Sequence, residues 1–503
     1  MVAAVMGSSM AFIDGTVVNV ALPAIQRDLH ASVFEAQWVV EAYALFLAAL
    51  LLVGGSLGDR FGRRRLFTLG VALFGLASLG CAAARDVQQL IAARAVQGVG
   101  AALLVPGSLA LISAAFPEGE RGRAIGTWSG FSGITAAFGP VLGGYLVDRF
   151  SWPWAFLINL PFAIAVLIVA WARVPESRNP HAPATLDIRG AVLATLGLGG
   201  VVYAFIEAPS RHWSAPAVLL ALSVGIAALV GFVVTESRSA APMLPPHYFR
   251  NRNFAGANLL TLGLYAALGG GLFFLPLNLI QVQGYSATAA GAALLPFILI
   301  MFALSRWAGR LVDRLGPRPP LVTGPLVAAA GFAAFALPTT GGTYWISFFP
   351  AIVVLGFGMT ITVAPLTTTV MNAVGPEAAG TASGVNNAVS RVAALLAIAI
   401  FGSVMAWAFD HRMDEAMRLV GLPDALTALV HSQRSKLAAI ELPAGIDAAT
   451  AATVHRAVGD AFISGFRWVM GLSAALALAS SLAAALLISG GPRPKAGVGS
   501  ARE

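Results

Sequence analysis

GSLGDRFGRRR, residues 55–65, lies between two long apolar stretches and carries one aspartate among four arginines. Its spacing, GxxxDRxGxR, recurs at 309–318. The first copy consists of Gly55, Asp59, Arg60, Gly62 and Arg64, and the second of Gly309, Asp313, Arg314, Gly316 and Arg318. Because each copy follows an apolar stretch, the repeat predicts two related halves, arranged in parallel about an axis along the membrane normal.

The composition is that of an integral membrane protein. Of the 503 residues, 58% are hydrophobic and 11% are charged, and the mean hydropathy is +0.80, whereas soluble proteins average roughly 25% charged residues. The net charge of +8 is spread over short connections without an interleaved aromatic stripe, so the sequence does not indicate nucleic-acid binding. The single cysteine, Cys81, excludes an intrachain disulfide.

The apolar segments predict an all-α polytopic fold, because about 20 apolar residues cross the hydrocarbon core of a bilayer. We predict fourteen spans, at 3–22, 36–57, 66–84, 88–112, 124–147, 155–172, 188–207, 215–235, 254–280, 288–308, 320–337, 345–366, 382–408 and 462–488. The distance between the two copies of the repeat fits six helices plus one inserted pair. We expect no cleavable signal peptide, because no basic segment precedes the first apolar run. Either the first helix inserts as it stands or a short N-terminal tail is missing.

Arginines orient the predicted spans. With a cytoplasmic N-terminus, the basic clusters at 60–65 and 310–318 fall inside, and the short outside connections carry only Arg27, Arg85, Arg149 and Arg211. This asymmetry predicts that both termini are cytoplasmic. The expected domains are an N-terminal six-helix bundle (1–173), a linker (174–187), the inserted pair (188–236), a second linker (237–253), a C-terminal six-helix bundle (254–488) and a cytoplasmic tail (489–503). Within the C-terminal bundle, the extracellular loop at 409–461 is expected to be a solvated hairpin or a pair of short helices.

Three ionisable residues fall well inside predicted spans of the first half: Asp14, Glu41 and Arg94. Each would cost at least about 2.5 kcal/mol at the centre of an isolated helix, so we expect them to face a cavity or one another. Burial disfavours the charged form of a carboxyl group and a nearby arginine favours it, so such a group can bind and release a proton. A purely structural ion pair is the alternative.

Two further patterns bear on function. The fifth span holds Gly126, Gly130, Gly133, Gly139, Pro140, Gly143 and Gly144, a spacing that lets helix backbones approach and, at the proline, favours a bend. The chain has no GxxxxGK[ST] phosphate loop, and its histidines all lie in connections, so we expect no ATP site, metal or other cofactor and no enzyme activity.

These motifs resemble those of the major facilitator superfamily, and more narrowly its fourteen-span drug:proton antiporter branch. The matching segments are GSLGDRFGRRR around Asp59, Arg60, Gly62, Arg63 and Arg64, RAVQGVGAA at 94–102 with Arg94, Gln97 and Gly98, GPVLGG at 139–144 together with Gly126, IDGTVVNVALP at 13–23 with Asp14, Thr16, Asn19 and Pro23, and FLINLP at 156–161. The resemblance implies that the loop at 55–65 acts as a conformational gate, that Arg94 takes part in proton coupling and that the fifth helix is typical of exporters.

The chain departs from the family pattern at three positions. Thr135 stands where the antiporter motif commonly has glycine, Pro153 where the family has arginine, and Glu41 where many relatives have an uncharged residue. Glu41 is therefore either a second proton site or a group that attracts cations. Five residues are candidates to line a substrate cavity: Asn19, Gln97, Phe273, Asn278 and Gln281. For the last three, which lie in the second half, core packing is the alternative. We expect Arg391 and Arg467 to snorkel to the membrane interfaces.

The leading hypothesis is a proton-coupled efflux antiporter for amphipathic or cationic small molecules, located in a bacterial cytoplasmic membrane and acting as a monomer through rocking of its two halves. It would be driven by the proton gradient alone. The sequence does not indicate whether a periplasmic adaptor is needed. The alternatives are a transporter for one specific metabolite or antibiotic in the same fold and, from another class, a channel or sensor.

Overall fold

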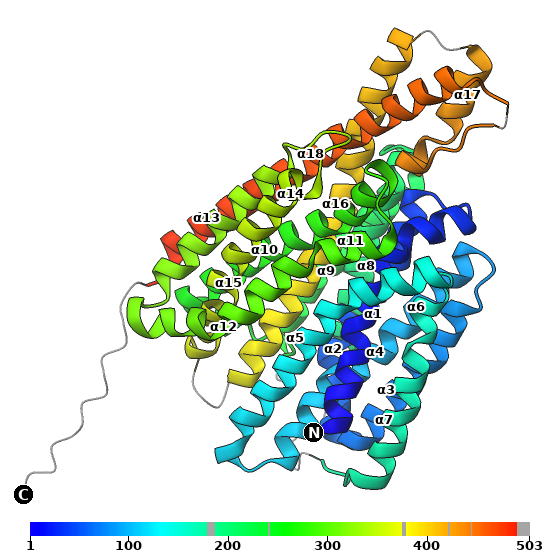
Figure 1. The fold of residues 1–503 in the computed structure, drawn as a ribbon. Coiled ribbons are helices and arrows are strands. Elements are labelled where there is room, and N and C mark those ends of the chain that lie inside the picture. The colour runs from blue at the N-terminus through cyan, green and yellow to red at the C-terminus, as the bar shows by residue number, and fades with distance from the viewer. Residues whose placement is uncertain (179–186, 240–241, 375–378, 421–422, 444, 490–503) are drawn as a thin grey trace, which may run out of the picture.

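The computed structural model describes residues 1–178, 187–239, 242–374, 379–420, 423–443 and 445–489, apart from some side chains, most of them between residues 118 and 137. These residues form helices and connections, without any strand (Figure 1). The helices are α1 (Val2–Asp28), α2 (Val33–Phe61), α3 (Arg63–Ala82), α4 (Val87–Ala115), α5 (Glu118–Arg149), α6 (Trp154–Leu157), α7 (Asn159–Arg173), α8 (Ile188–Arg211), α9 (Pro216–Arg238), η1 (Pro246–Arg250), α10 (Arg252–Leu277), η2 (Asn278–Val282), α11 (Ala287–Ala293), α12 (Leu295–Leu315), α13 (Arg318–Phe335), α14 (Tyr344–Ser347), α15 (Phe349–Asn372), α16 (Ala379–Val420), α17 (Asp424–Ser432), η4 (Arg434–Ala439) and α18 (Ala448–Leu487).

Short polar side chains begin several of these helices. Ser32 and Glu35 form a reciprocal capping box at the start of α2, and Asp86, Asp187 and Asp447 accept backbone hydrogen bonds at the starts of α4, α8 and α18. Such caps satisfy amide groups that a helix leaves without intrahelical partners. The helix starts are therefore set locally, by residues that flank the apolar stretches.

Within the described residues, twelve helical segments are long and apolar enough to cross a membrane. They coincide with twelve of the predicted spans. The remaining two predictions, 124–147 and 320–337, fall on α5 and α13, which are helical but are not among those twelve. The chain is thus a multi-span helical membrane protein.

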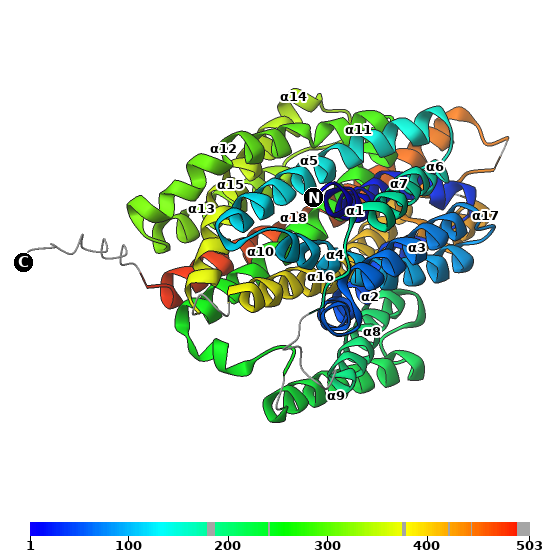
Figure 2. The same cartoon turned by 90° about the horizontal axis from the view of Figure 1, so that it is seen from below.

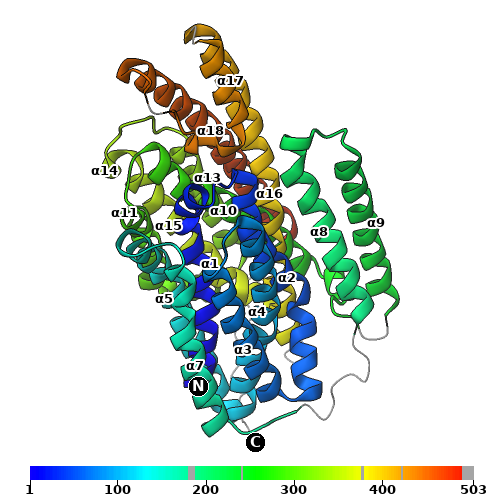
Figure 3. The same cartoon turned by 90° about the vertical axis from the view of Figure 1, so that its right-hand side faces the viewer.

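The helices pack in two groups with α8 and α9 beside them. α1, α2, α3, α4, α5 and α7 form one group through their contacts, and α10, α11, α12, α13, α15, α16 and α18 form the other. Figure 2 places α3, α6 and α7 on one side of the molecule and α12, α13 and α15 on the other. α8 packs on α9 and also against α2 and α16, and Figure 3 shows the pair standing at the edge.

The described residues of the predicted loop at 409–461 form a helical projection. α16 has 42 residues and α18 has 40, about twice the length that crosses a hydrocarbon core. Both helices continue beyond the neighbouring helices and carry α17 between them at one end of the molecule, here called the α17 end (Figure 3). η4 folds back from this projection and contacts α1, α2, α16 and α18.

Candidate functional site

A buried hydrogen-bond network surrounds the Asp14 carboxylate. One oxygen accepts from Arg94 Nη1 at 2.5 Å, and the other accepts from Gln97 Nε2 at 2.8 Å and from Asn159 Nδ2 at 2.9 Å. Ser78 Oγ accepts from the same two amide groups, at 2.9 and 3.3 Å. Asp14 is 0% and Arg94 1% exposed. Four helices, α1, α3, α4 and α7, therefore meet at one ion pair.

Arg94 is held on its other sides by α2 and α6. Its Nε donates to the Val39 carbonyl at 2.9 Å, and its guanidinium lies over the rings of Tyr43, at 4.3 Å from the ring centroid, and Phe156, at 5.7 Å. Gly98 allows α4 to reach α2, because a Cβ there would stand 2.5 Å from the Tyr43 carbonyl oxygen. These contacts fix one charged side chain in a low-dielectric setting, where loss of its carboxylate partner is costly.

Glu41 lies apart from this ion pair. Its side chain is 0% exposed, and neither carboxyl oxygen has a hydrogen-bond partner within the described residues. One turn earlier on α2, Gln37 donates to the Ile398 carbonyl of α16 at 3.2 Å, and Trp38 contacts Tyr203 of α8. Residues four apart share a helix face, so Glu41 lies on the side of α2 that faces α8 and α16. The structure brings two of the three predicted ionisable residues together and separates the third.

The loop at 55–65 is tied to the segment that follows α7. Asp59 accepts from Arg63 Nε at 2.7 Å, and the Glu176 carboxylate accepts from the backbone amides of Arg64 and Arg65, at 3.0 and 3.2 Å. Gly62 has φ +121°, and a Cβ there would come within 2.9 Å of Glu176. The bonds of Glu176 thus hold the α2–α3 turn to the end of α7, within one group of helices.

The second copy of the repeat forms a similar turn. Gly316 ends α12 with φ +77°, as Gly62 ends α2, and such angles favour glycine. Arg314 is exposed. The side chain of Asp313 lies outside the described residues, as do the surroundings of Gly126.

Glycines of the fifth span allow α5 to contact helices of both groups. A Cβ at Gly139 would stand 2.0 Å from Thr16 Oγ1, and a Cβ at Gly143 would stand 2.9 Å from Val17. Thr16 and Val17 are both on α1. A Cβ at Gly144 would stand 2.3 Å from the Ala287 carbonyl oxygen of α11. Since Cβ atoms are not found that close to other atoms, α5 can pack on α1 and α11 at these distances only with glycine at the contacts.

The start of α11 is bonded to the end of α5. Asp148 accepts from the backbone amides of Ala287 and Thr288, at 3.0 and 2.7 Å, and from Thr288 Oγ1 at 2.5 Å. Gln281, in η2 just before α11, donates through Nε2 to Oε1 of Gln26, at the end of α1, at 3.0 Å. These bonds join the two groups of helices at the α17 end.

The cavity candidates have different surroundings. Gln97 belongs to the Asp14 network, Gln281 bonds to Gln26, and Phe273 and Asn278 are buried. Asn19 is half-buried, and no described residue donates a hydrogen bond to its side-chain oxygen. Arg391 is half-buried, and no described residue accepts a hydrogen bond from its Nε. Arg467 is exposed, and its Nε donates to the Ala336 carbonyl at the end of α13, at 3.0 Å.

Several residues of these contacts were not singled out from the sequence. Ser78, Asp148 and Glu176 carry no motif, and Tyr43 reads as an ordinary aromatic residue of a span. Asn159 lies inside FLINLP, 156–161, so a polar residue within an otherwise apolar run was the one available signal.

A family model described as "Major Facilitator Superfamily" matches residues 4–398. The chain belongs to the major facilitator superfamily. Curated relatives include the puromycin resistance protein pur8 of Streptomyces alboniger, 39% identical over 83% of this chain and 84% of the relative, and the tetracenomycin C resistance and export protein of Streptomyces glaucescens, 32% identical over 96% and 90%. The multidrug resistance protein Stp of Mycobacterium tuberculosis is 35% identical over 81% of this chain and 75% of the relative.

Solved structures share the fold at low identity. A bacterial homologue of the human lysosomal transporter Spinster, in an inward-facing and unoccupied conformation, aligns with a TM-score of 0.66 at 19% identity, over 97% of this chain and 95% of that one. The inward-open xylose transporter XylE of E. coli aligns with a TM-score of 0.58 at 13% identity, over 97% and 96%. These likenesses describe the fold, and the relatives and neighbours are transporters rather than enzymes.

Proposed function

We propose that this protein is a proton-coupled efflux antiporter that exports amphipathic or cationic small molecules by alternating access. Membership of the superfamily and the resistance and export proteins among its relatives support export. The coupling step rests on the buried Asp14 network. No cofactor takes part, and the energy comes from the proton gradient.

Asp14 is the proposed coupling carboxylate. It is buried and accepts bonds from three side chains on two helices, α4 and α7. Protonation would remove its charge and leave the Arg94 cation without an anion, so the proton changes the electrostatic balance among these helices. A protein that moves one proton down 100 mV gains about 2.3 kcal/mol, which sustains roughly a 50-fold gradient of a neutral solute.

Glu41 is proposed as a second group that binds a proton or attracts a cation. An ionised carboxylate without a partner is costly in an apolar setting, and no described residue bonds to either oxygen. Its position on the face of α2 toward α16 and α8 places it where the two groups of helices meet. Motion between the groups would therefore change its surroundings.

The proposed cycle rocks two six-helix bundles, residues 1–173 and 254–488, with 188–236 as the inserted pair. α5 and α13 then complete fourteen spans of the drug:proton antiporter branch, in a bacterial cytoplasmic membrane, with both termini in the cytoplasm and a monomer as the working unit. In this assignment the α17 end is outside. The bonds of Asp148 and Gln281 and the close packing of α5 on α11 support a state that is closed on that side.

Transport into inside-out membrane vesicles tests the proposal. A fluorescent cation should accumulate when respiration acidifies the lumen, and collapse of both the pH gradient and the potential should abolish accumulation. Vesicles that carry Asp14→Asn should not accumulate it, and Gly471→Ala is a matched control because a Cβ there meets open space. Accumulation that persists after both gradients are collapsed would exclude proton coupling.

The second candidate is a transporter dedicated to one antibiotic. It is favoured by relatives whose names each specify one compound: puromycin, tetracenomycin C and methylenomycin A. Expression in a drug-sensitive host separates the two candidates. Protection against several unrelated cationic dyes and drugs supports the multidrug assignment, and protection against a single compound supports the dedicated one.

A further inference from the structure

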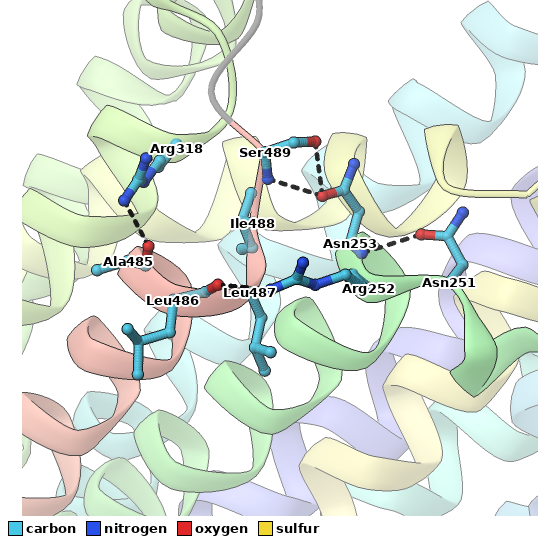
Figure 4. A pocket seen from close by; sticks show the side chains of 9 residues that line it. All are labelled: Asn251, Arg252, Asn253, Arg318, Ala485, Leu486, Leu487, Ile488 and Ser489. Atoms are coloured by element: carbon cyan, nitrogen blue, oxygen red, sulfur yellow. Dashed lines mark hydrogen bonds between the residues drawn. The ribbon is translucent and has the colours of Figure 1, made fainter.

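A polar pocket lies at the C-terminal end of α18, at the end of the molecule opposite α17 (Figure 1 and Figure 4). Its volume is about 500 Å³. The first turns of α10 and α13 and the last turn of α18 line it, through Asn251, Arg252, Asn253, Arg318, Ala485, Leu486, Leu487, Ile488 and Ser489. Arginines orient this end toward the cytoplasm.

The pocket is positively charged. Arg252 and Arg318 are both exposed, and none of its nine described lining residues is acidic. Arg252 donates to the Leu486 carbonyl at 3.3 Å and Arg318 to the Ala485 carbonyl at 2.6 Å. Because a guanidinium group has five N–H donors, most donors of the pair stay available. The positive dipole ends of α10 and α13 add to this charge, and the negative end of α18 opposes it at the carbonyls that the two arginines bond.

The remaining polar groups of the pocket are bonded to one another. Asn253 Oδ1 accepts from both the backbone amide and the hydroxyl of Ser489, each at 2.9 Å, and Asn251 caps the first turn of α10. These bonds and the two arginine–carbonyl bonds fix the three helix ends around the pocket (Figure 4). A ligand would therefore meet a formed site.

An apolar strip continues from the pocket into the predicted span of α18. Leu486 lines the pocket, and Leu482 and Leu478 follow at one-turn intervals, with exposures of 65%, 59% and 50%. Residues four apart share one helix face. A charged pocket beneath an exposed apolar strip matches a phospholipid, which joins a phosphate to acyl chains. A free phosphate ion would use the arginines only.

We propose that this pocket binds an anionic phospholipid of the cytoplasmic leaflet, with the phosphate between Arg252 and Arg318 and an acyl chain along Leu478, Leu482 and Leu486. The site lies outside the Asp14 network and does not depend on the proposed transport function. It would hold the ends of α10, α13 and α18 at the level of the lipid headgroups.

Lipid binding to the purified full-length protein tests the site. In neutral detergent, phosphatidylglycerol should bind more tightly than phosphatidylcholine with the same acyl chains, by native mass spectrometry and by the rise in thermal midpoint. Arg252→Gln and Arg318→Gln should each weaken phosphatidylglycerol binding about five-fold, the effect of about one basic residue at a lipid surface. Arg238→Gln removes the same charge from the end of α9, away from the pocket, and should have no effect.

Three results would overturn the proposal. They are equal binding of the two lipids, equal effects of the Arg238 and pocket variants, and stabilisation by inorganic phosphate or glycerophosphoglycerol that matches stabilisation by the lipid. The last result would assign the pocket to a soluble anion. Arg252→Lys and Arg318→Lys keep the positive charge while altering the bonds to the α18 carbonyls. These variants should therefore still prefer phosphatidylglycerol. The comparison separates loss of lipid binding from any loss of stability that the glutamine variants show without lipid.

Discussion

Replacing Asp14 with asparagine should destabilise the protein and abolish coupling, for separable reasons. The carboxylate accepts from Arg94 at 2.5 Å, from Gln97 at 2.8 Å and from Asn159 at 2.9 Å. Asparagine leaves the Arg94 guanidinium, which is 1% exposed, without an anion. It also replaces one accepting oxygen by an NH2 group, which cannot accept the hydrogen bonds made there. Loss of one partner of a buried ion pair costs about 3–5 kcal/mol, which is the expected loss of unfolding free energy.

A double-mutant cycle with Arg94→Gln gives the size of the interaction. Removing both charges should cost less than the sum of the single changes, because a buried neutral pair avoids the uncompensated charge. Unfolding in sodium dodecyl sulfate measures stability, and exchange driven by an imposed pH gradient in proteoliposomes measures coupling. The double variant should regain stability and remain uncoupled. Additive stability losses would refute the ion-pair reasoning, and pH-driven exchange by the double variant would refute the role of Asp14 as a proton site.

Four further substitutions test the other contacts. Glu41→Gln should fold normally, because neither oxygen accepts a hydrogen bond from a described residue, and should lose pH-driven exchange in proteoliposomes; wild-type exchange would place the second proton site elsewhere. Asp148→Ala removes the bonds to the start of α11 and should weaken closure of the α17 end by about 1–2 kcal/mol. The measurement is the distance between spin labels on α5 and α11, which should lengthen. An unchanged distance would mean that these bonds do not hold the end closed. Gly144→Ala should widen the same distance, since its Cβ would meet a carbonyl oxygen at 2.3 Å, whereas Gly471→Ala meets open space; equal effects of the two would contradict this. Asp59→Asn removes the negative charge that pairs with Arg63 of α3 and should slow transport of a dye without inverting topology; full transport would leave the loop as a membrane anchor.

The repeat shows how much local sequence could predict. Gly62 and Gly316 occupy equivalent places in GxxxDRxGxR, and both end a helix at positive φ. Both copies place glycine at the helix end because a chain reversal there depends mainly on the residues within it. The predicted spans likewise fall on helices, although α16 and α18 extend well past 408 and before 462 into the projection that carries α17.

Partner choice in the candidate site could not be predicted in the same way. Glu176 bonds to residues more than 100 positions earlier in the chain, and Asp148 to residues far later. Asn159 is 145 residues from Asp14. Neither composition nor spacing specifies which ends of distant helices become neighbours.

The sequence by itself determined the membrane class, the positions of the helices and the polar residues that they carry, because a bilayer requires long apolar segments whose backbone bonds are satisfied internally. Only the tertiary structure decided that Asp14 pairs with Arg94 while Glu41 faces α8 and α16. The physical reason is that lipid and protein interior are both apolar. Hydrophobicity therefore does not mark the inward face of a membrane helix, and its rotation is set by packing contacts such as those of Gly98 and Gly139.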